Sequence, residues 1–310
     1  MVPELVSAMY GASDRWVDVT NVVRALMRFG NGVRACNELG GDPLPNVPKV
    51  LCCRFADGTA ADFAEGETAF WNPINTSHLL YHICPFRHNR AVWQLNIEML
   101  KRHAAWINGK RIISIVQGTG CDDVDTVLGA IDGFRIDRLI VRLNSDLWEM
   151  ATFPAALREI ASTACDEALF YAHAKGVSHY GDELRAAIIW TEAMMAFLLG
   201  NRDRVLQKLG RHAAVGIFKR EHGLWGADWH YTGSFFGMRH DKLFTNRNWD
   251  CFHSHRSFIE FYPGAMIPSQ DAYDLCTVTA PEKWLDLDYS RWLEIQPALN
   301  DARARWLKPL

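Results

Sequence analysis

From residue 78 onward, short apolar runs alternate with segments whose apolar residues recur at helical spacing. This alternation constrains the fold more than any other feature of the chain, because it is typical of βαβ units and a parallel sheet. Strands are expected at residues 78–84, 111–116, 138–143 and 168–172. Parallel strands joined through helices cross over right-handedly, so we expect three right-handed crossovers in an α/β domain with a mainly parallel sheet.

The segments between these strands carry helix signals. Residues 91–106 place Val92, Leu95, Met99 and Trp106 on one face. Asp122 and Asp123 are N-cap residues for the next helix, and Pro154 suits the first turn of a third.

Beyond the fourth expected strand the signals continue with one clear element and several short ones. Residues 183–199 have the apolar stripe of a long amphipathic helix. A short strand at 214–218, an aromatic segment at 229–237 and a tryptophan-bearing C-terminal helix complete the expected elements.

Residues 1–75 differ in composition from the rest of the chain and are rich in Gly, Asp and Pro. Gly40-Gly41-Asp42-Pro43 and Asp57-Gly58 favour turns, and residues 16–20 and 50–55 read as strands between such turns. The stretch Asn72-Pro73-Ile74-Asn75-Thr76 discourages regular structure and makes a plausible linker. We therefore expect a small β-rich module at 1–75 and the α/β domain at 76–310.

Charge and cysteine usage exclude several classes of protein. Lys and Arg total 33 and Asp and Glu total 36, for a net charge of −3, so no positively charged surface for nucleic acid is expected.

The first ten residues lack the pattern of a signal peptide, and no apolar run reaches the ~18 residues that span a bilayer. The eight cysteines show no paired short spacing, which favours free thiols. We expect a cytoplasmic protein without a membrane span.

The loops after the expected strands are where ligands should bind, because the carboxyl ends of parallel strands share one edge of the sheet. These loops are rich in polar and cationic residues that could contact a diphosphate, although ordinary loop polarity would look the same. The candidate binding residues are Pro85, Phe86, Arg87, Arg90, Gln117, Asn144, His173, Lys175 and Gly176.

The succession of motifs carries a resemblance. His82-Ile83-Cys84-Pro85, His173-Ala174-Lys175-Gly176 and Gly233-Ser234-Phe235-Phe236, in that order, resemble bacterial glycosyltransferase-like proteins over residues 78–265. The resemblance implies the GT-A nucleotide-diphospho-sugar transferase fold, which is Rossmann-like, and it adds Ser234 to the candidate binding residues. The stretches Tyr10-Gly11-Ala12, Asp18-Val19-Thr20, Gly41-Asp42-Pro43 and Lys49-Val50-Leu51 resemble a small uncharacterised β-rich module that recurs on unrelated proteins. The resemblance assigns no role to residues 1–75, and a protein partner or a homo-oligomer through this module stays an open expectation.

One departure from the family pattern bears on metal dependence. Many such enzymes carry an Asp-x-Asp signature after the fourth strand, where its carboxylates hold a divalent cation against the donor diphosphate. Here the position reads His173-Ala174-Lys175. A protonated lysine cannot ligate a metal but can neutralise the charge on the leaving nucleotide. The hypothesis is a metal-independent transferase, with a divalent cation as the alternative.

Transfer to an acceptor hydroxyl with inversion needs a carboxylate as general base. Glu260 is the first choice and Asp228 the second, with an Arg256–Glu260 helical pair as the structural alternative for Glu260. The aromatic residues Trp225, Trp229, Tyr231 and Phe235 could stack on a sugar or belong to the core. The implied substrates are a nucleotide-diphosphate sugar and a glycan or other acceptor with a free hydroxyl.

Two other classes of function remain open. Cys251, His253 and His255 could bind zinc in a hydrolase. A non-catalytic binding or assembly protein is the other alternative, because fold does not fix function. An oxidoreductase is disfavoured, since Gln117-Gly118-Thr119-Gly120 lacks the third glycine of a dinucleotide fingerprint.

Overall fold

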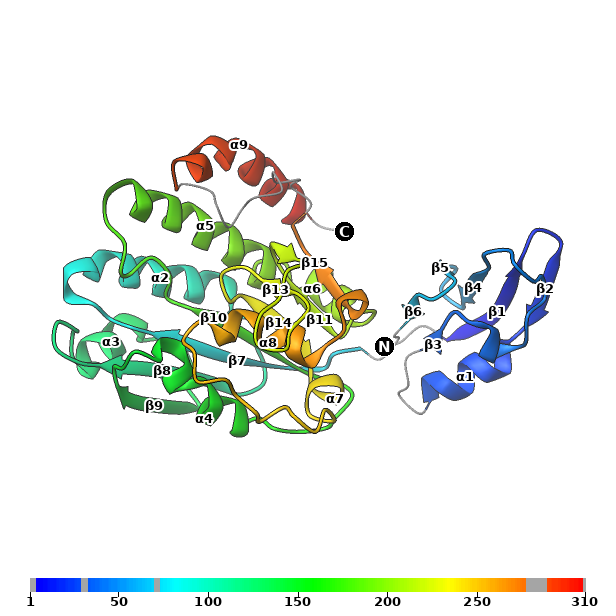
Figure 1. The fold of residues 1–310 in the computed structure, drawn as a ribbon, viewed down its shortest axis with the longest axis horizontal. Helices are drawn as coiled ribbons and strands as arrows, with labels where there is room; N and C mark the ends of the chain where they lie inside the picture. The colour runs from blue at the N-terminus through cyan, green and yellow to red at the C-terminus, as the bar shows by residue number, and fades with distance from the viewer. Residues whose placement is uncertain (1–3, 29–32, 70–72, 277–288, 309–310) are drawn as a thin grey trace. The chain divides into compact units, whose positions relative to one another are not determined.

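The computed structural model describes residues 4–28, 33–69, 73–276 and 289–308, with the side chains of 289–295 left out (Figure 1). The chain forms two units. One comprises Met1–Ile74 with Leu206–His212, and the other Asn75–Val205 with Ala213–Leu310.

The smaller unit is built on an antiparallel sheet with the strand order β2-β1-β4-β5. Its strands are β1 (Leu5–Ala12), β2 (Arg15–Asp18), β4 (Val50–Phe55) and β5 (Ala60–Ala64), and a separate pair is formed by β3 (Val33–Arg34) and β6 (Thr68–Ala69). Tyr10, Leu51 and Phe63 are among the buried side chains of its core. Among its described residues up to Ile74 the unit is thus mainly β, with the α-helix α1 (Thr20–Arg28) and a short 3₁₀ helix at Asn37–Leu39.

The strand expected at residues 16–20 is present as β2 but ends at Asp18, and helix α1, which was not expected, begins at Thr20. Strand β2 ends at Asp18, whose Oδ1 accepts a hydrogen bond from the Thr20 N–H at 2.9 Å, as a helix-capping carboxylate does. Val19 and Val23 are buried in the core of the unit. The hydrogen bond from Asp18 and the burial of Val19 and Val23 therefore favour the end of the strand and the start of the helix at this point.

The larger unit contains a seven-stranded sheet with the order β15-β11-β14-β10-β7-β8-β9. Strands β7 to β10 are mutually parallel, and β14 runs antiparallel between β10 and β11. The strands are β7 (Thr76–Ile83), β8 (Arg111–Gln117), β9 (Arg138–Leu143), β10 (Glu167–His173), β11 (Ala214–Gly216), β14 (Phe236–Arg239) and β15 (Ala272–Asp274). This mixed α/β architecture, with a mostly parallel core, agrees with the expected fold class at that level.

Helices lie on both faces of this sheet (Figure 1). Helix α2 packs against α3 and α5, α5 packs against α9, and α4 contacts β7 and β8. A hairpin of β12 (Lys219–Arg220) and β13 (His230–Tyr231) contacts α8. The helices are α2 (Arg90–His103), α3 (Val124–Ile131), α4 (Phe153–Arg158), α5 (Gly181–Leu199), α6 (Arg202–Leu209), α7 (His240–Leu243), α8 (Phe258–Met266) and α9 (Tyr289–Trp306). No helix in the described ranges is long and apolar enough to cross a bilayer.

The strand order reverses beside β7. The chain passes from β7 to β8 and then β9, and returns to place β10 on the other side of β7. In open α/β sheets, ligands bind outside the carboxyl ends of the strands at such a reversal. The topology therefore points to the β7–β10 junction as the place for a site.

The close packing of Gly216 in β11 generates a prediction about stability. A Cβ on Gly216 would lie 2.6 Å from Cγ of Tyr231, a fully buried ring whose hydroxyl donates to the Tyr273 carbonyl at 2.9 Å. We expect Gly216→Ala to lower the free energy of unfolding by about 1–3 kcal/mol, the usual cost of overpacking. Chemical denaturation measures this change.

The matched control is Gly129→Ala, because Gly129 lies in α3 and has no atom within 4 Å of an added Cβ. This variant should gain roughly 0.5–1 kcal/mol from helix propensity. Equal stability of the two variants would contradict the packing described for Gly216.

Candidate functional site

A cavity of about 190 Å³ lies at the carboxyl ends of the four parallel strands. His82 of β7, Val116 of β8 and His173 of β10 line it, together with Asn144, which directly follows β9. The rest of its wall comes from Cys84 and Phe86 after β7, from Trp148 and Glu149, from the chain after β10, and from Ser234, Arg256, Ser257, Ile259 and Glu260. The cavity therefore sits at the reversal of strand order.

Lys175 lies just beyond β10 and lines the cavity. Asn96 of α2 holds its backbone, accepting from the Lys175 N–H at 3.2 Å and donating to its carbonyl at 3.1 Å. The Nζ atom lies 4.1 Å from the centre of the Trp190 ring, a cation–π contact. Burial lowers the pKa of Lys175, while the carboxylates of Glu260 and Glu149 oppose that shift. The Lys175 ammonium thus lies against the face of the Trp190 ring beside the cavity.

Glu260 faces the same cavity from the first turn of α8. Its Oε1 accepts a hydrogen bond from the Gly233 N–H at 3.0 Å. Burial raises the pKa of Glu260, and Lys175 acts in the opposite direction. Within the described part of the chain, no ion pair joins Glu260 to Lys175 or to Arg256. The carboxylate and the ammonium therefore influence each other's pKa from the wall of one cavity without forming an ion pair.

His173 and Glu149 form a buried pair in the cavity wall. His173 Nδ1 lies 2.5 Å from Glu149 Oε1, and His173 Nε2 lies 3.2 Å from the Gly233 carbonyl. Burial would raise the pKa of Glu149, but the charge and hydrogen bond of His173 outweigh it and lower the pKa to about 2. Both ring nitrogens of His173 face acceptors, which fits an imidazolium that donates from each nitrogen.

Arg256 and Trp148 form the exposed part of the wall. The guanidinium carbon of Arg256 lies 4.0 Å from the centre of the Trp148 ring. Among the described residues no carboxylate pairs with Arg256, whereas Glu149 is paired with His173. The Arg256 guanidinium therefore adds an unneutralised positive charge to the cavity wall, which favours an anionic ligand.

Several candidate residues from the sequence meet at the cavity and others do not. Arg87 and Arg90 both contact the Asp122 carboxylate, with Arg90 Nε 3.0 Å from Oδ2. Asp228 is exposed and, like Pro85 and Gln117, does not line the cavity. The predicted residues that do line it are Phe86, Asn144, His173, Lys175, Gly176, Ser234 and Glu260.

Sequence reasoning missed Glu149 and His82. Glu149 lies in the short 3₁₀ helix η3 (Trp148–Ala151), a few residues past the loop that was singled out after β9. His82 lies inside an apolar strand and reads as core from its neighbours. Trp229, Tyr231 and Phe235 are fully buried, so these three aromatic rings belong to the core.

The three residues considered for zinc, Cys251, His253 and His255, are all exposed. His253 Nδ1 and His255 Nδ1 each accept a backbone N–H at 3.2 Å, and both rings pack against Trp225. They are not among the described residues whose ligand atoms converge closely enough for a metal ion.

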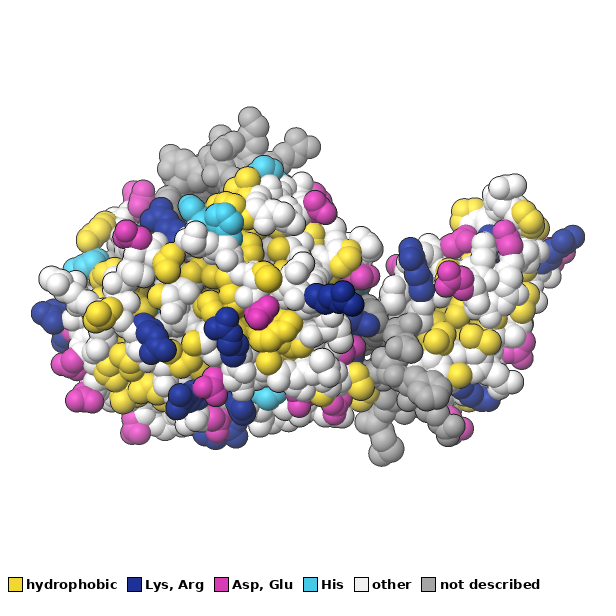
Figure 2. Space-filling view, turned by 60° about the horizontal axis from the view of Figure 1, so that its bottom comes forward, with side chains coloured by type: hydrophobic (Ala, Val, Ile, Leu, Met, Phe, Trp, Pro, Cys, Tyr) yellow, Lys and Arg dark blue, Asp and Glu magenta, His cyan; other side chains and the backbone are white. Residues whose placement is uncertain are grey.

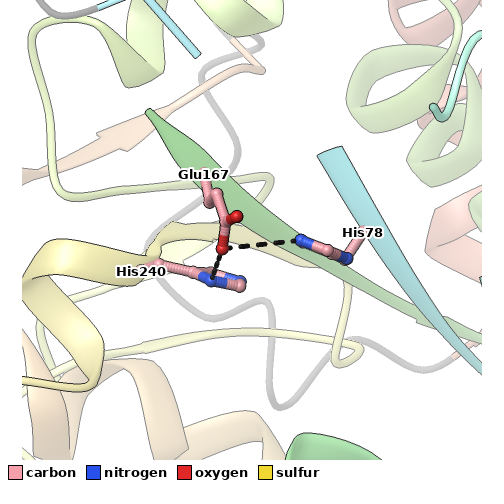
Figure 3. Close-up of side chains that lie close together, drawn as sticks. All are labelled: His78, Glu167 and His240. Carbon is pink, nitrogen blue, oxygen red and sulfur yellow. Dashed lines mark hydrogen bonds and ion pairs between the residues drawn. The ribbon is translucent and has the colours of Figure 1, made fainter. Parts of the chain in front are cut away.

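A group of ligand-type side chains does converge at the amino ends of the strands (Figure 3). Glu167 Oε2 lies 3.0 Å from His240 Nδ1 and 3.7 Å from His78 Nε2, and the three ligand atoms lie within 4.8 Å of one another. Two imidazoles and a carboxylate are a known ligand set for zinc. The spacing is compatible with a divalent cation, at the edge of the sheet opposite the cavity.

The hydrogen bonding of His78 opposes metal binding in this arrangement. The Lys110 N–H donates to His78 Nδ1 at 3.0 Å, so the neutral ring carries its proton on Nε2. A ligating Nε2 must instead offer a lone pair. As it stands, Glu167 faces N–H groups of two imidazoles and links β7, β10 and α7.

Charged side chains of the surface show no large region of one sign on the face in Figure 2, where basic and acidic residues are interspersed. This distribution agrees with the net charge of −3 and gives no sign of a nucleic-acid interface on that face.

Comparisons with known proteins leave the family open. No protein-family model matches the chain, and no curated protein matches its sequence. Among solved structures it is similar to a protein from Desulfovibrio desulfuricans G20 described as a "putative nucleotide-diphospho-sugar transferase", with a TM-score of 0.34 and 10% identity over 74% of this chain and 97% of that chain. So distant a likeness assigns neither a family nor an activity.

The buried histidines generate a prediction about pH. Burial and the neighbouring His78 lower the pKa of His240 to about 3, from an ordinary value of 6.5. Between these values the unfolded chain binds a proton that the folded chain does not, so stability falls as the pH drops through this window, by up to about 1.4 kcal/mol per pH unit. His82, whose pKa burial lowers to about 4, acts with the same sign.

We expect His240→Gln to make this loss of stability with falling pH shallower, as measured by urea unfolding from about pH 7 to about pH 5. The exposed His88 provides the control variant His88→Gln, which should keep the wild-type slope. An unchanged slope in His240→Gln would show that the imidazole takes up its proton in the folded state.

Proposed function

We propose that this chain transfers a sugar from a nucleotide-diphosphate sugar to an acceptor hydroxyl in glycan biosynthesis. The observation that carries the proposal is Lys175, whose ammonium lies against Trp190 beside a cavity at the reversal of strand order. No hydrogen bond or ion pair with another described residue occupies its Nζ. An ammonium held in this way is available to an anionic ligand such as a diphosphate.

In the proposed reaction, Glu260 accepts the proton of the acceptor hydroxyl while the hydroxyl oxygen forms a bond to the anomeric carbon of the sugar. The bond between that carbon and the diphosphate oxygen breaks, and its electron pair leaves with the diphosphate. Lys175 neutralises the negative charge that develops there. The raised pKa of Glu260 suits a base, because a carboxylate of higher pKa accepts a proton more readily.

The residues after β10 support a reaction without a divalent cation at this position. Where relatives would carry Asp-x-Asp, this chain has His173-Ala174-Lys175. Both nitrogens of His173 are engaged by Glu149 and Gly233, and a protonated lysine has no lone pair to offer. These residues do not fit a cation, so Lys175 and the unpaired Arg256 take the electrostatic role in the proposal.

Lys175→Ala tests the donor site. We expect it to remove most of the rise in melting temperature that the cognate sugar nucleotide gives the unmodified protein. Losing a charge-assisted hydrogen bond of about 1.5–3 kcal/mol weakens binding by roughly 10- to 150-fold. Thermal melting against UDP-, GDP-, CMP- and dTDP-sugars, with and without a chelator, measures the effect.

Lys175→Arg retains a cation and should bind better than Lys175→Ala. Lys101→Ala is the matched control, because Lys101 Nζ donates to the Ala130 carbonyl at 2.7 Å and does not line the cavity. Unimpaired binding by Lys175→Ala would refute its role, and binding or activity lost to a chelator and restored by manganese would refute metal independence. No shift with any donor in the unmodified protein would favour a non-catalytic assembly protein.

Glu260→Gln tests the base. The amide oxygen of Gln can still accept from the Gly233 N–H, so donor binding should persist while transfer falls by about 10²- to 10⁴-fold. Product formation with the cognate donor measures the rate. Asp228→Asn is the control, since Asp228 is exposed and away from the cavity. Full turnover in Glu260→Gln would remove Glu260 from this role.

A further inference from the structure

Two histidines stand side by side at the junction of β7 and β10. His82 and His173 are register partners of the parallel pair, so their side chains project from the same face of the sheet. Both line the cavity. His173 donates from both nitrogens to acceptors, so it has no lone pair to offer a ligand.

Thr152 fixes a different protonation pattern on His82, in which one ring nitrogen keeps its lone pair. The Thr152 hydroxyl lies 2.8 Å from His82 Nδ1 and 3.3 Å from the Glu149 carbonyl. A hydroxyl has a single proton and a carbonyl can only accept. Both contacts are hydrogen bonds only if the hydroxyl donates to Glu149 and His82 Nδ1–H donates to the hydroxyl oxygen. The proton of the neutral His82 ring is therefore on Nδ1, and Nε2 carries a lone pair.

This lone pair opens onto the cavity. Within the described ranges, His82 Nε2 has no hydrogen-bond partner, and it is not sealed from solvent as the Nε2 atoms of His78 and His240 are. Burial lowers the pKa of His82 to about 4 although the Glu149 carboxylate opposes this shift, so the ring stays neutral near pH 7. A neutral imidazole with a free Nε2 accepts a hydrogen bond and cannot donate one there.

We propose that His82 Nε2 recognises a hydroxyl group of the bound sugar, with Thr152 as the positioning residue that fixes the proton on Nδ1. This inference rests on the proposed function and adds the orientation in which the sugar nucleotide lies in the cavity. Phosphate oxygens are acceptors, so they are directed to Lys175 and Arg256 and away from His82. A sugar hydroxyl can donate to His82, so the sugar lies over the β7–β10 junction.

The tautomer of His82 can be tested in the protein without any ligand. Nitrogen NMR of histidine-labelled protein distinguishes protonated from unprotonated ring nitrogens. We expect His82 to be protonated on Nδ1 alone and His173 on both nitrogens. Thr152→Val should release the His82 tautomer, and Thr152→Ser, which keeps the hydroxyl, should preserve it. A proton on His82 Nε2 in the unmodified protein would overturn the inference and leave the proposed function standing.

The hydroxyl contact is tested by comparing the cognate sugar nucleotide with the nucleoside diphosphate that lacks the sugar. His82→Phe should weaken binding of the sugar nucleotide about tenfold, the effect of one lost hydrogen bond, and leave the nucleoside diphosphate unchanged. His82→Gln, which can present an acceptor, should restore part of the loss. Far-UV circular dichroism confirms that each variant is folded.

The outcomes separate the two proposals. Equal weakening of both ligands by His82→Phe, or no weakening of either, overturns the hydroxyl contact while donor binding itself remains established. A full loss in His82→Gln as well as His82→Phe also counts against it. If no sugar nucleotide binds the unmodified protein, the proposed function fails and the hydroxyl contact fails with it, whatever the His82 tautomer.

Discussion

The parallel pairing of β7 with β10 is the constraint on which the arrangement of the cavity depends. It reverses the strand order and brings His82 and His173 to the same edge of the sheet in register. Groups distant in sequence contact the ring nitrogens of each histidine. Glu149 and the Gly233 carbonyl contact His173, and the Thr152 hydroxyl contacts His82. Two identical side chains thereby acquire different hydrogen-bonding roles from their surroundings alone.

Burial of charge is the second organising principle of the cavity. Removing an ammonium or a carboxylate from water is costly, and each group is pushed toward its neutral form. In this cavity Lys175 and Glu260 each oppose the shift that burial imposes on the other. Trp190 and the Gly233 N–H supply further stabilising contacts. The pair can therefore remain charged at the wall of the cavity without forming an ion pair.

Local patterns were sufficient to predict much of the larger unit. The strand expected at residues 138–143 is β9, and Asp123 caps α3 by accepting from the Thr126 N–H at 2.7 Å. Helix α1 was not predicted, and the hydrogen bond from Asp18 and the burial of Val23 that accompany it are evident only in three dimensions.

The cavity was harder to anticipate than the fold. Lys175 was identified as a candidate from its place after a strand, and Glu260 as a carboxylate that could act as a base. Both line one cavity. Arg87 and Arg90 looked equally suitable, but the Asp122 carboxylate that engages them is evident only in three dimensions. The roles of His82 and Glu149 depend on hydrogen bonds to distant residues, which no local pattern records.

Gly233 connects these groups although it has no side chain. Its N–H contacts Glu260, its carbonyl contacts His173, and an added Cβ would lie 2.8 Å from both Met194 Sδ and Trp190 Cζ2. Its φ of +96° also disfavours any other residue. Mutation of Gly233 would therefore disturb the Glu260 carboxylate, the His173 imidazole and the Trp190 ring that contacts the Lys175 ammonium. We therefore expect natural variants that keep Gly233 to keep Glu260, His173 and Lys175 as well, and variants that replace Gly233 to replace these residues too.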